Sequence, residues 1–211
     1  LTSAKPMADA IGKLLMLVDQ LAAEGIGIEH LDLGGGLGIR YKQEAPPTPE
    51  AWIGALLNAI GKYPQKILIE PGRSLVGNAG VLLTRVEYLK QGEARNFAVV
   101  DAAMNDLIRP ALYDAYHEVL PVAQGRGEPR RYDVVGPVCE SADFLARDRE
   151  LALREGDVLA VMSAGAYGMV MSSNYNSRPR AAEVLVDGER LHLVRDRERV
   201  EQLYSGERLA K

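Results

Sequence analysis

The sequence predicts a chain in two parts, an α/β segment followed by a mainly β domain. In residues 1–78, helical apolar patterns alternate with short apolar strands, as in β/α units. After about residue 78 the alternation changes, and most patterned segments are typical of strands. We therefore expect a domain boundary there, with a mainly antiparallel β-sandwich or barrel over residues 79–211.

The first part contains two predicted helices and two predicted strands. Residues 6–24 keep a 3.6-residue apolar period, with Ser3 as a possible cap and Gly25 at the end. A strand follows at residues 29–33, and a second helix begins at Thr48 and stops at Gly61. The next strand covers residues 66–69.

This part is too short to form a closed α/β barrel. It holds two strand–helix units at most, whereas a closed (β/α)₈ barrel needs eight and typically ~250 residues. Either the preceding units are absent from this chain, or the fold is not a barrel. The chain opens at Leu1 directly into a helical pattern, so we expect a piece of a longer protein.

The second part is predicted to be built mostly from strands. Asp187-Gly188 is a strong two-residue hairpin signal between the last two of them. An exposed loop is expected at residues 124–131, and short helices at 110–117 and 197–204. The predicted strands are residues 81–88, 96–101, 132–138, 157–162, 180–186 and 189–195.

Composition limits the classes of function. A net charge of −4 disfavours nucleic acid or an anionic membrane surface as a partner. No apolar run approaches the ~20 residues that span a bilayer. A single cysteine, Cys139, excludes an internal disulfide and fits a reducing compartment, so we expect a cytoplasmic protein. The three histidines have no metal-ligand spacing, and no metal site is expected.

Two predicted strand ends are rich in glycine and charge. Gly34, Gly35 and Gly36 follow the first strand, and Glu70-Pro71-Gly72-Arg73 follows the second. The carboxyl rim of an α/β barrel builds phosphate sites from such loops, and glycines let backbone N–H groups approach an anion. The pattern therefore predicts a phosphate site. The alternative is two tight turns, with Glu70 paired to Arg73 and no ligand.

Three further places in the sequence are candidates for binding or chemistry. Arg109 and Tyr113 are four residues apart and could face an anion or an amino-acid head group, or form part of a solvated turn. Cys139 beside Glu140 could donate a proton or act as a nucleophile, although a lone cysteine is commonly buried and inert. Tyr167 lies among small residues and could meet a ligand, or be a turn tyrosine.

Taken together, these segments resemble the diaminopimelate decarboxylases, which are fold-type III pyridoxal-phosphate enzymes. The resemblance extends over essentially the whole chain, and its motifs occur in the same order. They are residues 32–38, 70–80 (EPGRSLVGNAG), 100–113 (VDAAMNDLIRPALY), 135–141 (VGPVCES), 164–168 (AGAYG) and 174–179 (NYNSRP). The resemblance implies that residues 1–78 are the last strands and helices of a TIM-type barrel, followed by most of a β-domain.

The resemblance also implies roles for individual residues. Glu70 would pair with the pyridinium nitrogen and keep the ring an electron sink. Cys139 would donate the proton after CO₂ is lost, and Cys139 and Glu140 would come from the partner subunit of a homodimer. The cofactor site would comprise Gly34, Gly35, Gly36, Glu70, Pro71, Gly72, Arg73 and Tyr167. The substrate site would comprise Arg73, Arg109, Tyr113, Glu140 and Tyr167.

The sequence departs from the family pattern in one respect. The lysine that forms the Schiff base with pyridoxal phosphate belongs to an aromatic-Ala-x-Lys motif, and none of the seven lysines here lies in one. The chain therefore resembles the C-terminal half of an enzyme that converts meso-diaminopimelate to L-lysine and CO₂, and alone it should be inactive. The alternatives are a related basic amino-acid decarboxylase or racemase of the same fold, and a non-catalytic binding module.

Overall fold

The computed structural model describes residues 5–123 and 127–210, which divide into two compact units. Unit 1 extends to Ala79, and unit 2 runs from Gly80 onward. Each unit has a hydrophobic core of its own. Ser3, the expected cap of the first helix, lies outside the described residues.

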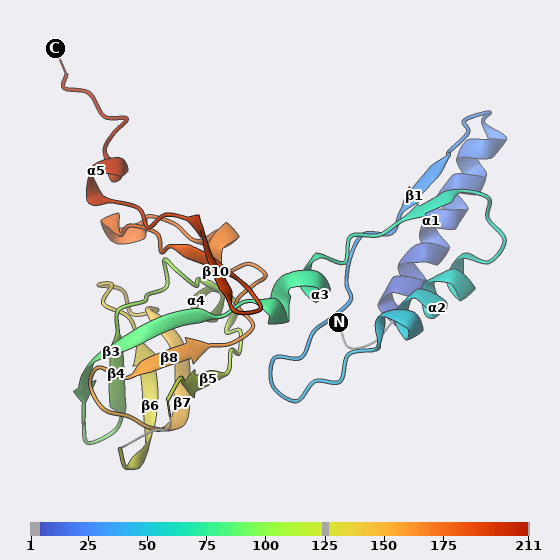
Figure 1. The fold of residues 1–211 in the computed structure, drawn as a ribbon. Coiled ribbons are helices and arrows are strands. Elements are labelled where there is room, and N and C mark those ends of the chain that lie inside the picture. The colour runs from blue at the N-terminus through green and yellow to red at the C-terminus, as the bar shows by residue number, and fades with distance from the viewer. Residues whose placement is uncertain (1–4, 124–126, 211) are drawn as a thin grey trace. The chain divides into compact units, whose positions relative to one another are not determined.

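Unit 1 contains two long helices and a short parallel sheet (Figure 1). Strand β1 (His30–Asp32) pairs in parallel with β2 (Lys66–Leu68), with Leu31 opposite Ile67. Helix α1 (Lys5–Ala23) and helix α2 (Pro49–Ile60) pack against this sheet, and Thr48 caps α2 by accepting a hydrogen bond from the Ala51 N–H. The core of the unit is formed by Ile11, Leu15, Val18, Leu31, Leu33, Leu37, Trp52, Leu56 and Ile60.

Unit 1 ends in a short helical segment that was not expected from the sequence. Helix α3 (Gly72–Val76) begins after Pro71 and continues into a 3₁₀ turn at Gly77–Ala79. The parallel strands and their helices agree with two β/α units. They form an open layer of two strands, so residues 5–79 do not by themselves close a barrel.

Unit 2 is built on a six-stranded sheet with the order β5-β8-β3-β4-β6-β7. All neighbours pair antiparallel except β4 and β6, which are parallel. The edge strands β5 and β7 approach each other, so the sheet is nearly closed into a barrel (Figure 1). The strands are β3 (Leu82–Lys90), β4 (Asn96–Val100), β5 (Val119–Pro121), β6 (Pro129–Val135), β7 (Phe144–Ala152) and β8 (Val158–Val161).

The core of unit 2 lies inside this curved sheet. Its fully buried side chains include Val86, Val100, Leu107, Val134, Leu145, Leu159 and Val161. Helix α4 (Arg109–Tyr113) follows β4 and ends because Asp114 takes a left-handed conformation with φ 50°. A mainly antiparallel β-domain was the prediction for this part of the chain, and the sheet has that character.

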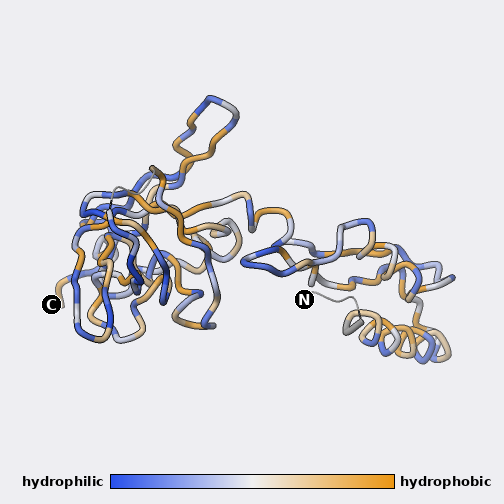
Figure 2. The backbone as a smooth tube through the Cα atoms, turned by 90° about the horizontal axis from the view of Figure 1, so that it is seen from below, coloured by the Kyte–Doolittle hydropathy of each residue, from blue (hydrophilic) through white to orange (hydrophobic). Residues whose placement is uncertain are grey.

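A separate hairpin follows the six-stranded sheet. Strand β9 (Glu183–Asp187) pairs antiparallel with β10 (Arg190–Arg195), and Figure 2 shows the hairpin projecting with apolar strands. Asp187 pairs with Arg190, so the two-residue turn is Gly188-Glu189, one position later than predicted. Gly188 has φ 59°, the left-handed conformation that such turns require. Helix α5 (Val200–Leu203) comes near the end of the chain.

Several element boundaries predicted from the sequence were wrong. Residues 129–131, expected in a loop, begin β6; residues 124–126 of that loop lie outside the described residues. The helix expected over 110–117 stops at Tyr113 because of Asp114. Strands β5 and β7 were missed, the first because it is three residues long and the second because its polar residues hide the strand pattern.

No helix in residues 5–123 and 127–210 combines the length and the apolar character needed to cross a membrane.

Leu159 tests the core of unit 2. Leu159 on β8 is fully buried, and Leu159→Ala should lower the free energy of unfolding by about 2–5 kcal/mol, because transfer energy is lost and a cavity is left. Urea unfolding of the purified protein measures this change. Leu209→Ala is the control, since Leu209 is 97% exposed and its truncation should change the free energy by less than about 0.5 kcal/mol.

Candidate functional site

In unit 1 the glycine-rich turn and the Glu70 loop are in direct backbone contact. The Glu70 N–H donates to the Gly34 carbonyl over 2.8 Å, immediately beyond the paired strands β1 and β2. A Cβ atom on Gly35 would lie 2.4 Å from the Glu70 carbonyl oxygen. Because carbon and oxygen cannot approach so closely, only glycine allows the two loops to meet here.

The conformation of the turn also requires glycine. Gly34 has φ 71° and Gly36 has φ 113°, values that side chains disfavour. The Gly34 N–H donates to the Asp32 carboxylate over 2.8 Å, which fixes the start of the turn at the end of β1. The result is a stretch of backbone without side chains at the carboxyl ends of two parallel strands.

The Glu70 loop presents charged side chains next to this turn. Glu70 is exposed, and Pro71 leads into α3, where the Ser74 hydroxyl donates to the Pro71 carbonyl over 2.7 Å. The guanidinium of Arg73 lies 5.9 Å from the centre of the Tyr41 ring, within range of a cation–π contact. Unit 1 thus brings together the predicted residues from Gly34 to Gly36 and from Glu70 to Arg73.

In unit 2 the structure brings Arg109 and Tyr167 together. Arg109, at the start of α4, is 7% exposed, and its guanidinium carbon lies 5.9 Å from the centre of the Tyr167 ring. Tyr167 has φ 62° in the tight loop after β8 and is 40% exposed. Tyr113, at the other end of the short helix α4, is largely exposed. A buried cation beside a partly exposed aromatic ring suits an anionic ligand group.

Cys139 and Glu140 lie in the loop between β6 and β7. Both are exposed, and the Glu140 carboxylate accepts a hydrogen bond of 3.3 Å from the Tyr175 hydroxyl. This contact with a carboxylate raises the pKa of Tyr175 above its ordinary value. Tyr175 belongs to the NYNSRP stretch, so that motif and the Cys139 loop meet in unit 2.

Asp143, which the sequence analysis did not select, connects two of the motif loops. Its carboxylate accepts from the Val138 N–H and from the Met104 N–H, each over 2.7 Å. Asp143 is 5% exposed, and this burial raises the pKa of its carboxyl, an effect that the two backbone hydrogen bonds oppose. A Cβ on Gly136 would lie 2.5 Å from the carboxylate, which explains the glycine before Pro137.

Arg178 makes a second connection that sequence reasoning missed. Its Nε donates to the Asn105 side-chain oxygen over 2.9 Å, and its Nη2 donates to the Asp101 carbonyl over 2.6 Å. Asn105 is almost fully buried. The sequence identifies NYNSRP only as a motif. The arginine within it, Arg178, is the feature that could have indicated this contact.

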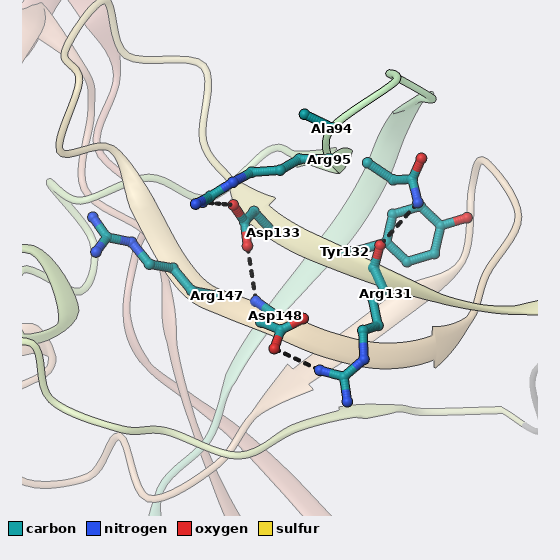
Figure 3. A pocket seen from close by; sticks show the side chains of 8 residues that line it. Ala94, Arg95, Arg131, Tyr132, Asp133, Arg147 and Asp148 are labelled. Atoms are coloured by element: carbon teal, nitrogen blue, oxygen red, sulfur yellow. Dashed lines mark hydrogen bonds and ion pairs between the residues drawn. The ribbon is translucent and has the colours of Figure 1, made fainter.

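A hollow of unit 2 lies elsewhere and is lined by other residues. Figure 3 shows it beside β6 and β7. Its volume is about 480 Å³. Arg95 pairs with Asp133 over 3.0 Å, and Arg131 pairs with Asp148. The charges within these two pairs neutralise one another, and Arg147 lies over the Phe144 ring. The hollow contains none of the predicted site residues: its lining is Ala94, Arg95, Asn96, Arg131, Tyr132, Asp133, Arg147 and Asp148.

Known protein families and solved structures that are similar to this chain agree with the motif order and the β-rich unit. Residues 9–165 match the family model described as "Pyridoxal-dependent decarboxylase, C-terminal sheet domain". This match covers most of the chain, and the chain therefore belongs to the pyridoxal-dependent decarboxylase family.

Within this family, several of the matched relatives are diaminopimelate decarboxylases. The Pseudomonas aeruginosa enzyme is 63% identical over 209 residues, which are 99% of this chain and 50% of the relative. The crystal structure of the enzyme from M. jannaschii superposes with a TM-score of 0.93 at 38% identity, covering 100% of this chain and 50% of that one. A Helicobacter pylori diaminopimelate decarboxylase complexed with L-lysine gives a TM-score of 0.90 at 38% identity, with 97% and 51% covered. The chain spans about half the length of the curated relatives it matches.

Removing the Asp143 carboxylate should destabilise unit 2. Asp143→Ala leaves the Met104 and Val138 N–H groups without their acceptor, at a cost of about 2–4 kcal/mol in the free energy of unfolding. Urea unfolding measures the loss. Asp196→Ala, at an exposed position, is the matched control and should change stability by less than about 0.5 kcal/mol. Equal effects of the two substitutions would contradict the connecting role of Asp143.

Proposed function

We propose that the complete protein that includes this chain decarboxylates meso-2,6-diaminopimelate to L-lysine and CO₂. The observation that supports this most directly is the 63% identity to the Pseudomonas aeruginosa diaminopimelate decarboxylase along nearly the whole chain. The Helicobacter pylori relative was crystallised with L-lysine, which would be the product here. The activity belongs to the complete protein because this chain corresponds to half of such enzymes.

The residues of unit 1 fit a phosphorylated cofactor. At the turn of Gly34 and Gly36 the backbone is bare, and the Gly35 contact leaves no room for a Cβ. An anion can therefore approach the N–H groups of Gly35 and Gly36 closely, whereas the Gly34 N–H already donates to Asp32. We assign Gly34, Gly35 and Gly36 to the phosphate of pyridoxal 5′-phosphate, with Glu70, Pro71, Gly72, Arg73 and Tyr167 completing the cofactor site. When bound, the cofactor supplies an electron sink for the bond that breaks.

Glu70 would maintain the electronic state of the ring. Its carboxylate is exposed at the end of β2, on the loop that contacts the glycine turn. A carboxylate that accepts a hydrogen bond from a ring nitrogen favours the protonated nitrogen, because it stabilises the positive charge. A lysine in the upstream half of the protein would hold the cofactor covalently.

The charged residues suit a substrate with a carboxylate and an ammonium at its distal end. We propose that Arg73, Arg109, Tyr113, Glu140 and Tyr167 bind that end. A guanidinium pairs with a carboxylate through two parallel hydrogen bonds, and Glu140 can accept from an ammonium. Arg109 is buried, so a distal group consisting only of an ammonium, as in ornithine, would meet an unfavourable positive charge.

Cys139 would deliver the proton that replaces CO₂. Its thiol Sγ is exposed on the loop between β6 and β7. In our proposal Cys139 and Glu140 act in the site of the partner subunit, so the active form is a homodimer. Their exposure in this chain is consistent with that arrangement.

Substrate assays with the complete protein test the proposed function. We expect release of CO₂ and formation of lysine from meso-diaminopimelate, with ornithine and arginine at least about 100-fold poorer in kcat/KM, because neither has a distal carboxylate for the guanidinium groups to bind. The 211-residue chain alone should show no turnover. Preferential turnover of ornithine would support the related basic amino-acid decarboxylase instead. A natural gene that encodes only this chain would support a non-catalytic module.

The glycine contact provides a test that does not depend on turnover. In the complete protein, Gly35→Ala should weaken binding of pyridoxal phosphate by about tenfold or more, because the added Cβ forces the two loops apart. Titration by cofactor absorbance measures the change. Gly54→Ala in α2 is the matched control, since a Cβ there meets nothing within 4 Å and cofactor binding should be unchanged. If Gly35→Ala bound pyridoxal phosphate as tightly as the native protein, the assignment of the glycine turn to the cofactor phosphate would be wrong.

A further inference from the structure

His117 is a buried side chain that has no role in the function proposed above. It follows α4 in the chain, precedes β5, and is 0% exposed. Its Nε2 lies 3.0 Å from Arg109 Nη1, and its Nδ1 lies 2.8 Å from the Met162 carbonyl oxygen. The ring therefore bridges the candidate substrate-binding arginine and the end of β8.

The two contacts define the protonation state of the ring. A carbonyl oxygen only accepts, so Nδ1 must bear the hydrogen that it donates to Met162. A guanidinium only donates, so Nε2 must present its lone pair to Arg109. Only the neutral ring with its hydrogen on Nδ1 satisfies both partners.

The surroundings favour this neutral form. Burial lowers the pKa of His117, and the positive charges of Arg109 and Arg149 lower it further, against the opposing effect of the Met162 carbonyl. A protonated ring would direct an N–H group at the Arg109 guanidinium. The contact is thus a neutral acceptor beside a permanent cation at neutral pH.

Met162 connects His117 to the loop that includes Tyr167. The loop begins directly after Met162 and is tightly wound, with Ser163 at φ 58° and Tyr167 at φ 62°. A Cβ on Gly168 would lie 2.3 Å from the Ala164 carbonyl oxygen, so only glycine allows the loop to pack this closely on itself. Through one imidazole, Arg109 is therefore held to the strand end from which the Tyr167 loop departs.

The backbone of His117 is itself held in place from two sides. Arg149 Nη2 donates to the His117 carbonyl over 3.3 Å, and the Arg149 guanidinium stacks on the Tyr116 ring at 4.0 Å. The Met162 N–H donates to the Glu118 carbonyl over 2.8 Å, next to the paired strands β5 and β8. The imidazole is thus attached to the sheet rather than to a mobile loop.

We infer that His117 is a positioning residue that orients Arg109 toward the anionic distal group of the substrate. The inference rests on the function proposed above. A neutral imidazole accepts one of the five guanidinium N–H groups without cancelling the charge, whereas a carboxylate in its place would neutralise it. His117 therefore fixes the guanidinium and preserves its charge for the ligand.

Two substitutions separate the two contacts of the ring. In His117→Asn, the side-chain amide replaces Nδ1 and can still donate to Met162, but the acceptor for Arg109 is lost. In His117→Gln, the longer side chain returns an oxygen near the position of Nε2. In the complete enzyme we expect KM for diaminopimelate to rise about tenfold or more in His117→Asn, with kcat changed less than about threefold. His117→Gln should restore KM to within about threefold of the native value.

The exposed histidine His192 provides the control for the His117 variants. His192→Asn, at an exposed histidine of β10, should leave KM and kcat unchanged. A native KM in His117→Asn would overturn the role of His117. The role would also be overturned if His117→Asn and His117→Gln raised KM by the same factor and this rise followed the loss of thermal stability in each variant. Absence of turnover by the native enzyme would instead overturn the proposed function.

A spectroscopic measurement tests the contact independently of turnover. Imidazole ¹⁵N NMR of the complete protein at neutral pH should show His117 with a protonated Nδ1 and an unprotonated Nε2. In Arg109→Lys the Nε2 resonance should shift, because its hydrogen-bond donor is changed. The opposite tautomer, or a doubly protonated ring, would overturn the inference whatever the substrate proves to be.

Discussion

The loop arrangement of unit 2 depends most on the two backbone hydrogen bonds that the carboxylate of Asp143 accepts. Two loops from different strand ends each direct a backbone N–H into the same buried space, and one side chain accepts both. Burial opposes the charged form, while the two hydrogen bonds favour it. The balance is favourable only while both donors remain in place, so the loops are mutually dependent.

Unit 1 solves the equivalent problem by a different physical route. Its two loops meet through backbone alone, and the absence of a side chain at Gly35 permits the contact with Glu70. In unit 2 the loops are connected by polar side chains. In unit 1 they are connected by a backbone contact that the absence of a side chain at Gly35 permits. Both devices place functional groups on irregular segments that a regular sheet holds in position.

Local patterns were sufficient for most of the fold. The helical period of α1 and the capped start of α2 correspond to features of the structure. Strand β7 was not predicted, because its sequence FLARDRELA lacks a sustained alternation and Asp148 interrupts it with φ 52°. Short elements such as β5 contain too few residues for a period to be visible.

The candidate site could be predicted only in part, for a related reason. Gly34 to Gly36 and Glu70 to Arg73 follow strands directly, so their grouping is a consequence of parallel pairing. Met104, one partner of Asp143, lies 39 residues away in the chain, and Asn105, one partner of Arg178, lies 73 residues away; no local pattern encodes such distances. His117 appeared only as a histidine without metal spacing, because its role depends on two groups that meet it in three dimensions. The roles of single residues came from the family resemblance rather than from periodicity.

The β9–β10 hairpin has a practical consequence for handling this polypeptide. Val184, Leu185 and Val186 on one strand, and Leu191, Leu193 and Val194 on the other, are all more than half exposed in the part of the chain that the structure describes. A two-stranded ribbon also offers hydrogen-bonding edges on both sides. Ribbons with exposed apolar faces and unpaired edges associate with one another. The isolated 211-residue chain should therefore self-associate as its concentration rises. Detergent or a solubilising fusion would keep it monomeric.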